Sequence, residues 1–92
     1  MRESAPTARP IARPDVALRR VGSEWVLYDP ARGRAHVLNQ SAAAVWAYCD
    51  GSRDPSEIAK AIAVEVPSTD QEAIGRDVED VVRRFAAEGL LR

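Results

Sequence analysis

The sequence is short of the residues that most often carry chemistry. It has 92 residues, with one cysteine (Cys49) and one histidine (His36). A lone cysteine cannot form a disulfide within the chain, which is typical of proteins from the reducing cytoplasm. A metal site needs several ligands grouped in space, and neither residue has a second cysteine or histidine at ligand spacing. We therefore predict no metal site, and we expect a cytoplasmic protein.

Long apolar runs and glycine-rich loops are missing as well. No apolar stretch approaches the roughly 18 residues of a membrane span, and the N-terminus lacks the apolar centre of a secretory signal. The five glycines stand singly, so no glycine-rich loop is present to cradle a phosphate. His36 could be paired with Ser41 or Cys49 as a nucleophile, but a chain this short has little room for a catalytic cleft. The sequence therefore indicates no enzyme, no cofactor and no membrane partner.

The charges are nearly balanced in number but unevenly placed. Thirteen basic and fourteen acidic residues give a net charge of −1. Arginines dominate the first 20 residues, whereas the part from Ser41 onward holds ten acidic and six basic side chains. A nucleic-acid-binding domain usually shows a basic face on its folded part. The acidic second half is therefore unfavourable for binding nucleic acid.

Apolar and turn-forming residues divide the chain into an arm and one folded domain. Residues 1–14 hold three prolines and three arginines without periodicity, which predicts a disordered or loosely docked, basic, proline-rich arm. The domain is expected over residues 15–92. Its first part predicts three strands, at residues 15–21, 24–28 and 34–38. The turn signals Gly22-Ser23 and DPARG (29–33) join them, so the strands should form an antiparallel meander.

The apolar period changes from 2 to 3.6 after Asn39, which predicts three helices between residues 40 and 88. Asn39 is a good N-cap, Gly51 a good helix end, and Asp54 a good start for the second helix. The third helix should span about residues 70–88. The expected core combines the centres of the three apolar stripes: Trp46, Ile58, Ile62, Val78, Val82 and Phe85. The predicted fold class is α+β, with a three-stranded antiparallel sheet packed on three helices.

Several short motifs, taken in order and spacing, resemble those of the PqqD-like family. They are Leu38-Asn39 followed by Ser41-Ala42, then Cys49-Asp50-Gly51, Ile58, Asp77-Val78 and Gly89-Leu90-Leu91. Members of this family are small peptide chaperones, also called recognition elements for ribosomally made, post-translationally modified peptides. The segment WVLYDPARGRAHVLN replaces the longer one usual in the chaperone of pyrroloquinoline quinone biosynthesis, so the resemblance is to a relative in the wider family.

The resemblance implies a winged-helix-like fold and a way of binding. The leader segment of a precursor peptide should add as a strand to the edge of the third strand, beside the third helix. The peptide-binding residues that this implies are Arg34, Ala35, His36, Val37, Leu38, Asp77, Val81 and Arg84, with Glu88 at the end of the same helix flank. The peptide would be presented to a tailoring enzyme, which in this family is often a radical SAM enzyme. A free strand edge also allows a homodimer to form edge to edge.

A second function stays open because the winged-helix fold is shared. The alternative is a nucleic-acid-binding regulatory protein, with Arg53 and Lys60 as contacts. No predicted helix carries a row of basic residues, so the sequence favours leader recognition over this alternative.

Overall fold

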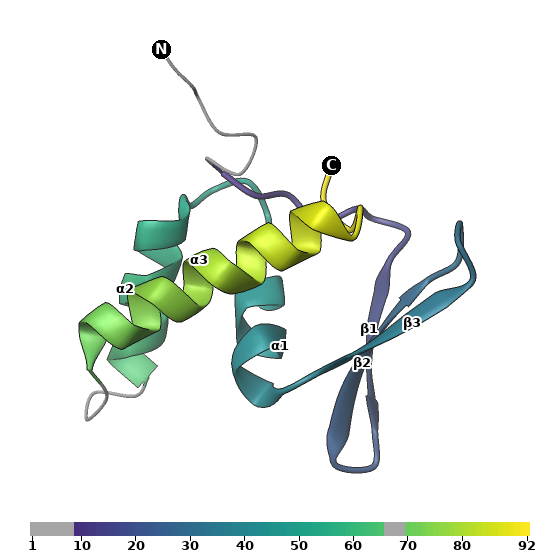
Figure 1. Ribbon diagram of the computed structural model, residues 1–92, viewed down its shortest axis with the longest axis horizontal. Coiled ribbons are helices and arrows are strands. Elements are labelled where there is room, and N and C mark those ends of the chain that lie inside the picture. Colours follow the sequence, from purple (N-terminus) through teal and green to yellow (C-terminus); the bar gives the residue numbers. More distant parts are fainter. Residues whose placement is uncertain (1–8, 66–69) are drawn as a thin grey trace.

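The computed structural model describes residues 9–65 and 70–92. The elements are β1 (Ala17–Val21), β2 (Glu24–Asp29), β3 (Arg34–Leu38), α1 (Gln40–Ala47), α2 (Pro55–Glu65) and α3 (Gln71–Ala87) (Figure 1). The three strands form an antiparallel sheet in the order β1-β2-β3, and the three helices stand beside it, which confirms the predicted α+β class. In the described part of the chain, no helix has the length and apolar character needed to cross a membrane.

The register of the sheet separates a covered face from an open one. β2 and β3 pair with Leu27 opposite His36 and Tyr28 opposite Ala35. Their connection closes at Gly33, whose φ of 62° suits glycine, which lacks the Cβ that disfavours this conformation. Because side chains alternate along a strand, fully buried Leu27 and largely buried His36 face the helices. Tyr28 and Ala35 are exposed on the opposite face.

Local capping explains where the helices begin. Asn39 accepts a hydrogen bond from the Ala42 N–H at 2.8 Å, as predicted for the start of α1. Asp54 and Glu57 cap α2 reciprocally, because the side chain of each accepts from the backbone N–H of the other at 2.9 Å. These caps satisfy backbone donors that the first helical turn leaves unpaired.

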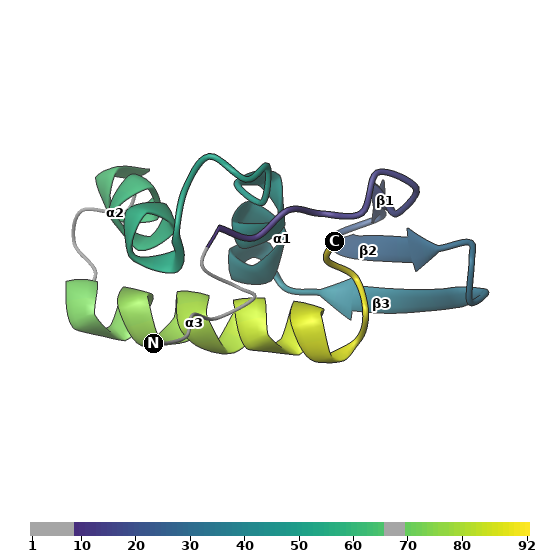
Figure 2. The ribbon, with the colours of Figure 1, turned by 90° about the horizontal axis from the view of Figure 1, so that it is seen from above.

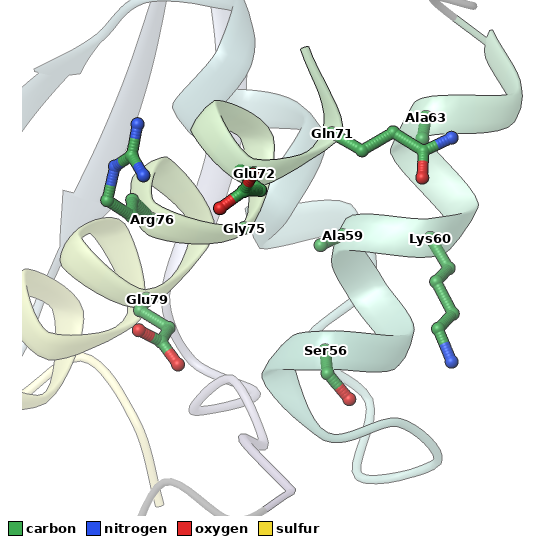
Figure 3. A pocket seen from close by; sticks show the side chains of 9 residues that line it. All are labelled: Ser56, Ala59, Lys60, Ala63, Gln71, Glu72, Gly75, Arg76 and Glu79. Atoms are coloured by element: carbon green, nitrogen blue, oxygen red, sulfur yellow. The ribbon is translucent and has the colours of Figure 1, made fainter.

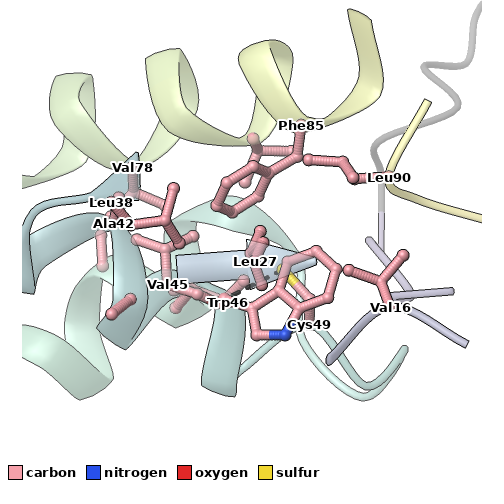
Figure 4. Close-up of a cluster of buried hydrophobic side chains, with 14 of the residues drawn as sticks. Val16, Leu27, Leu38, Ala42, Val45, Trp46, Cys49, Val78, Phe85 and Leu90 are labelled. Carbon is pink, nitrogen blue, oxygen red and sulfur yellow. Dashed lines mark hydrogen bonds between the residues drawn. The ribbon is translucent and has the colours of Figure 1, made fainter. Parts of the chain in front are cut away.

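The core lies where the sheet meets the three helices (Figure 4). Phe85 of α3 meets Trp46 of α1 edge to face, with ring centroids 5.3 Å apart. Of the six predicted core residues, Trp46, Ile58, Val78, Val82 and Phe85 are buried. The prediction is wrong for Ile62, which is only partly buried, because it lines a surface hollow between α1, α2 and α3.

The final residues of the arm predicted over residues 1–14 are docked on the domain. Ile11 forms a β-bridge with Asp50, and Ala12 forms one with Leu91. Arg13 donates to both carboxylate oxygens of Asp29, at 3.0 and 3.1 Å. Residues 1–8 lie outside the described residues. The folded domain therefore includes residues 10–14, and Asp29, predicted as a turn residue, is a buried partner of this segment.

Candidate binding groove between the third strand and the third helix

β3 has a strand partner on one side only. The sheet order makes β1 and β3 its two edges, and β3 pairs with β2 alone among the described residues. Figure 2 shows the C-terminal half of α3 running beside β3. An unpaired edge presents a row of backbone N–H and C=O groups that another strand can pair with. The edge of β3 that faces α3 is therefore a candidate site for an extended peptide.

The contact of Arg84 with β3 identifies the backbone groups that face this groove. The Arg84 Nη2 atom lies 3.5 Å from the carbonyl oxygen of Val37, so this carbonyl is directed toward α3 and away from β2. In an antiparallel ladder, successive residues direct their N–H and C=O groups to opposite sides of the strand. Ala35 and Val37 therefore face the free edge, while His36 pairs with β2.

Side chains from β3 and α3 meet at the end of the groove near the helix C-terminus. His36 Nδ1 lies 3.4 Å from Glu88 Oε1, and Arg84 Nε lies 3.4 Å from the same oxygen. The end of α3 is fixed by hydrogen bonds from Gly89 N–H to Ala86 O and from Leu90 N–H to Phe85 O. This glycine-terminated helix end turns Leu90 into the core and leaves Glu88 beside β3.

The same flank of α3 leads to an apolar hollow near the start of α1. Asp77 and Val81 line this hollow, whose volume is about 520 Å³. Its other walls come from α1, α2 and the core side of α3: Gln40, Ser41, Ala44, Val45, Ile62, Glu65, Ile74 and Val78. Because Asp77, Val81 and Arg84 follow one another at helical spacing, the hollow and the β3 edge belong to one continuous flank. The hollow offers space for an apolar side chain.

A second hollow lies between α2 and α3, away from β3 (Figure 3). It has a volume of about 420 Å³, and small residues form its floor: Ala59, Ala63 and Gly75. Its rim carries charges of both signs, including Lys60 and Glu79. None of the predicted peptide-binding residues lines it. We assign no function to this hollow.

The structure brings some of the predicted site residues together and separates others. His36, Val37 and Arg84 meet at the groove, and Ala35 is exposed along the same edge. Asp77 and Val81 lie farther along α3, at the hollow.

Arg34 and Leu38 lie at the two ends of β3. Arg34 is exposed at the first position of β3, opposite Asp29 of β2. The Leu38 side chain is only 2% exposed and packs in the core. The sequence prediction also missed Gln40 and Ser41, which line the hollow but carried only a helix-start signal.

Neither a metal-binding cluster nor a reactive thiol is found in the described residues. No group of three or more histidine, cysteine, aspartate or glutamate side chains in the described ranges could hold a metal ion. Burial raises the pKa of the Cys49 thiol to about 12, so the thiol stays protonated near neutral pH. Its Sγ lies 3.3 Å from the Val45 carbonyl oxygen. Cys49 is therefore a core residue, and its protonated thiol is a poor nucleophile.

A three-stranded antiparallel sheet with an open edge, together with three helices, defines a small α+β domain. The family model described as "Coenzyme PQQ synthesis protein D (PqqD)" matches residues 24–91. The chain belongs to this family. Among curated proteins, no match was found.

Two solved structures are similar to the chain. The first, "TbiB1 in Complex with the TbiA(beta) Leader Peptide", is 27% identical, with a TM-score of 0.73 over 89% of this chain and 94% of that one. The second, "Lasso peptide synthetase B1 complexed with the leader peptide", is 20% identical, with a TM-score of 0.75 over 92% of this chain and 99% of that one. Both similarities span nearly the whole fold.

Proposed function

We propose that this protein binds the leader segment of a ribosomally made precursor peptide and presents the peptide to a modifying enzyme. The leader adds as a fourth strand to the free edge of β3. The observation that carries this proposal is the unpaired edge at Ala35 and Val37, which Arg84 of α3 reaches. Membership of the PqqD family, and the similarity to a protein solved with its leader peptide, support the same function.

Backbone pairing alone supplies too little free energy for specific binding. An antiparallel peptide can form up to four hydrogen bonds with the N–H and C=O groups of Ala35 and Val37, worth about 2–6 kcal/mol in total. Association itself costs about 4–15 kcal/mol in lost translational and rotational freedom. Burying one apolar side chain in the hollow at Val81 adds about 1.5–3 kcal/mol. The edge therefore aligns the peptide, and side-chain pockets select it.

The partner of the loaded protein is a peptide-tailoring enzyme, for example a radical SAM enzyme. The protein itself contributes binding and no catalysis. The free, buried Cys49 fits a reducing compartment, so we place this function in the cytoplasm. The alternative as a nucleic-acid binder has no support from the relatives. The acidic excess from Ser41 onward is also unfavourable for it.

The test is an NMR titration of ¹⁵N-labelled protein with leader peptides of precursor genes encoded beside its own gene. We expect shift changes at residues 34–38 and along α3 from Asp77 to Glu88. Ala35→Pro or Val37→Pro should abolish binding, because proline lacks the N–H that pairs with the peptide.

A matched control places the same substitution on the other sheet edge. The turn at Gly22-Ser23 has two residues, so Val21 and Glu24 close it as a hydrogen-bonded pair. Hydrogen-bonded and non-hydrogen-bonded pairs alternate along the ladder, so the N–H of Arg20 faces the free edge of β1. Arg20→Pro should therefore leave leader binding intact. The proposal fails if no leader perturbs residues 34–38 while duplex DNA shifts Arg53 and Lys60.

A further inference from the structure

One face of the sheet gathers exposed apolar side chains from all three strands. Five large apolar side chains of the described part are exposed, and three of them belong to the sheet: Val21 of β1, Tyr28 of β2 and Val37 of β3. Cross-strand partners share a face and neighbours along a strand alternate, so all three lie on the face opposite buried Leu27. Among the described residues, no helix covers this face.

The register defines this surface, which we call the open face. On it, Val26 of the central strand lies between Arg19 of β1 and Val37 of β3. Its two charged members, Arg19 and Glu24, belong to β1 and β2, so the part formed by β3 is uncharged. An apolar surface bordered by polar residues is typical of a protein–protein contact. The members of the open face are Ala17, Arg19, Val21, Glu24, Val26, Tyr28, Ala35 and Val37.

The open face continues onto the strand that the leader adds in the proposed function. Ala35 and Val37 offer their backbone groups to the leader, and their side chains belong to the open face. Leader residues directly opposite Ala35 and Val37 point their side chains to this same face, because cross-strand partners share a face. Binding of the leader therefore widens the open face by one strand, and two leader side chains, two residues apart, become part of it.

This continuity indicates which partner the open face fits. A partner seated on the widened face contacts the protein and the leader at once, so its affinity depends on whether the leader is bound. Such dependence suits an enzyme that must distinguish the loaded protein from the empty one. A second copy of the chain would gain nothing from it. The helix side of the sheet offers no comparable surface, because Leu27 and Leu38 are buried there in the core.

We propose that the open face is the docking surface for the peptide-modifying enzyme, which binds it through an apolar surface of its own. The inference rests on the proposed function, because the leader strand completes the surface. The position of Arg19 and Glu24 away from β3 sets the chemistry of the partner. Its surface should be uncharged beside the leader and carry charges of both signs only at the border over β1 and β2.

The experiment measures two affinities for each purified variant. One is for the leader of the precursor encoded beside its gene, by fluorescence anisotropy, and the other is for the modifying enzyme encoded there, by biolayer interferometry. Tyr28→Arg and Val21→Arg place a charge on the open face, at side chains that are 46% and 61% exposed. Val64→Arg is the matched control, because Val64 is 80% exposed on α2, outside the sheet. None of the three residues belongs to the leader-binding edge.

The two open-face variants should weaken enzyme binding about tenfold, because the contact strips water from the new charge. They should keep the leader affinity of the wild type within about twofold, and Val64→Arg should change neither affinity. Wild-type protein saturated with leader should bind the enzyme about tenfold tighter than the free protein, since two leader side chains enlarge the surface. Tyr28→Arg decides the matter if Val21→Arg does not fold.

Three results would contradict the assignment in different ways. Unchanged enzyme affinity in both open-face variants overturns the docking surface, and so does a wild type that binds the leader but not the enzyme. A homodimer that Tyr28→Arg disrupts while enzyme binding persists also overturns it, because the open face then serves a second copy; sedimentation detects this. Failure of the wild type to bind the leader overturns the proposed function itself.

Discussion

Two side-chain clusters tie distant segments to the C-terminal end of α3, and they differ in completeness. In the first, Arg13 donates to both oxygens of Asp29 at 3.0 and 3.1 Å and to the Gly89 carbonyl oxygen at 2.9 Å. In the second, His36 and Arg84 each approach Glu88 at 3.4 Å, and two buried atoms stay unpaired. Both combine a cation or imidazole with a carboxylate. The satisfied cluster holds the fold together, and the unsatisfied one borders the free strand edge where a ligand is expected.

Geometry accounts for the difference in completeness. The planar guanidinium of Arg13 presents a donor fork that matches the two oxygens of a carboxylate. Asp29 accepts a further bond from the Ala31 N–H at 3.1 Å, so its fully buried carboxylate is well supplied with donors. Arg84 is 45% exposed and divides its donors between Glu88 and the Val37 carbonyl oxygen. An arrangement shared in this way is easily rearranged by a competing peptide.

The largest loss of stability is expected from a substitution that loosens both clusters at once. Phe85 is fully buried in α3, next to Arg84 and one turn before Gly89. Phe85→Ala should lower the free energy of unfolding by about 3–5 kcal/mol, because it removes a buried ring and leaves a cavity. Urea denaturation followed by circular dichroism measures the change. A loss below about 1 kcal/mol would mean that Phe85 does not anchor this end of the helix.

The second prediction makes the same substitution in each cluster. Arg13→Gln leaves the buried Asp29 carboxylate without its cation, so the melting temperature should fall by roughly ten degrees or more. Arg84→Gln should lower it by less than about three degrees, because an exposed ion pair contributes little. Scanning calorimetry of the two variants compares them directly. Equal losses would contradict the distinction between a structural and an open cluster.

Lowering the pH should weaken the cluster of Arg13 and Asp29. The hydrogen bonds from Arg13 hold the pKa of Asp29 below its ordinary value, so folding favours the ionised form. This contribution is complete above about pH 4, the ordinary carboxylate range, and is lost as the pH falls through the lowered pKa of the folded state. Melting temperatures between pH 2 and 7 should therefore drop less steeply for Arg13→Gln than for the wild type. Parallel curves for the two proteins would argue against Asp29 as the group responsible.

The smallest expected effect concerns pairing between copies. The Arg84 guanidinium covers the Val37 carbonyl, and β3 carries no proline or lysine to discourage a second strand. Arg84→Ala should shift a weak edge-to-edge dimer to lower protein concentration, by about twofold to fivefold. Sedimentation equilibrium over a wide concentration range tests this, with Arg83→Ala as the matched control. Identical monomer behaviour of both variants at all concentrations would contradict it.

Local signals in the sequence were sufficient to predict much of the fold. The bounds of β3 and the Asn39 cap agree with the prediction, because alternation and capping depend on neighbouring residues. The Arg13–Asp29 pair joins residues 16 apart in the sequence, and Arg13 lies outside every predicted strand and helix. Nothing local marks such a pair, which is why residues 10–14 were predicted as part of a disordered or loosely docked arm.

The sequence predicted which strand carries the candidate site, but it did not predict which residues of that strand are buried or which hollow lies beside it. The resemblance pointed to the β3 edge, but only the register and the contact of Arg84 distinguish groove-facing Val37 from buried Leu38. The hollow at Asp77 and Val81 depends on how three helices diverge in space. The unpaired state of His36 and Glu88 depends on atomic distances between two elements far apart in the sequence. No residue pattern in the sequence predicts either property.

The bridge between Ala12 and Leu91 has a consequence for engineering. It places the last residues of the chain beside the segment that precedes β1, and Arg92 N–H donates to the Ile11 carbonyl oxygen at 2.7 Å. A short linker from Arg92 to Arg9 would therefore close the described domain into a ring, and new ends could be opened in the exposed Gly22-Ser23 turn. Such a circular permutant would keep β3 and α3 intact and could be inserted into a host protein as a portable peptide-capturing module.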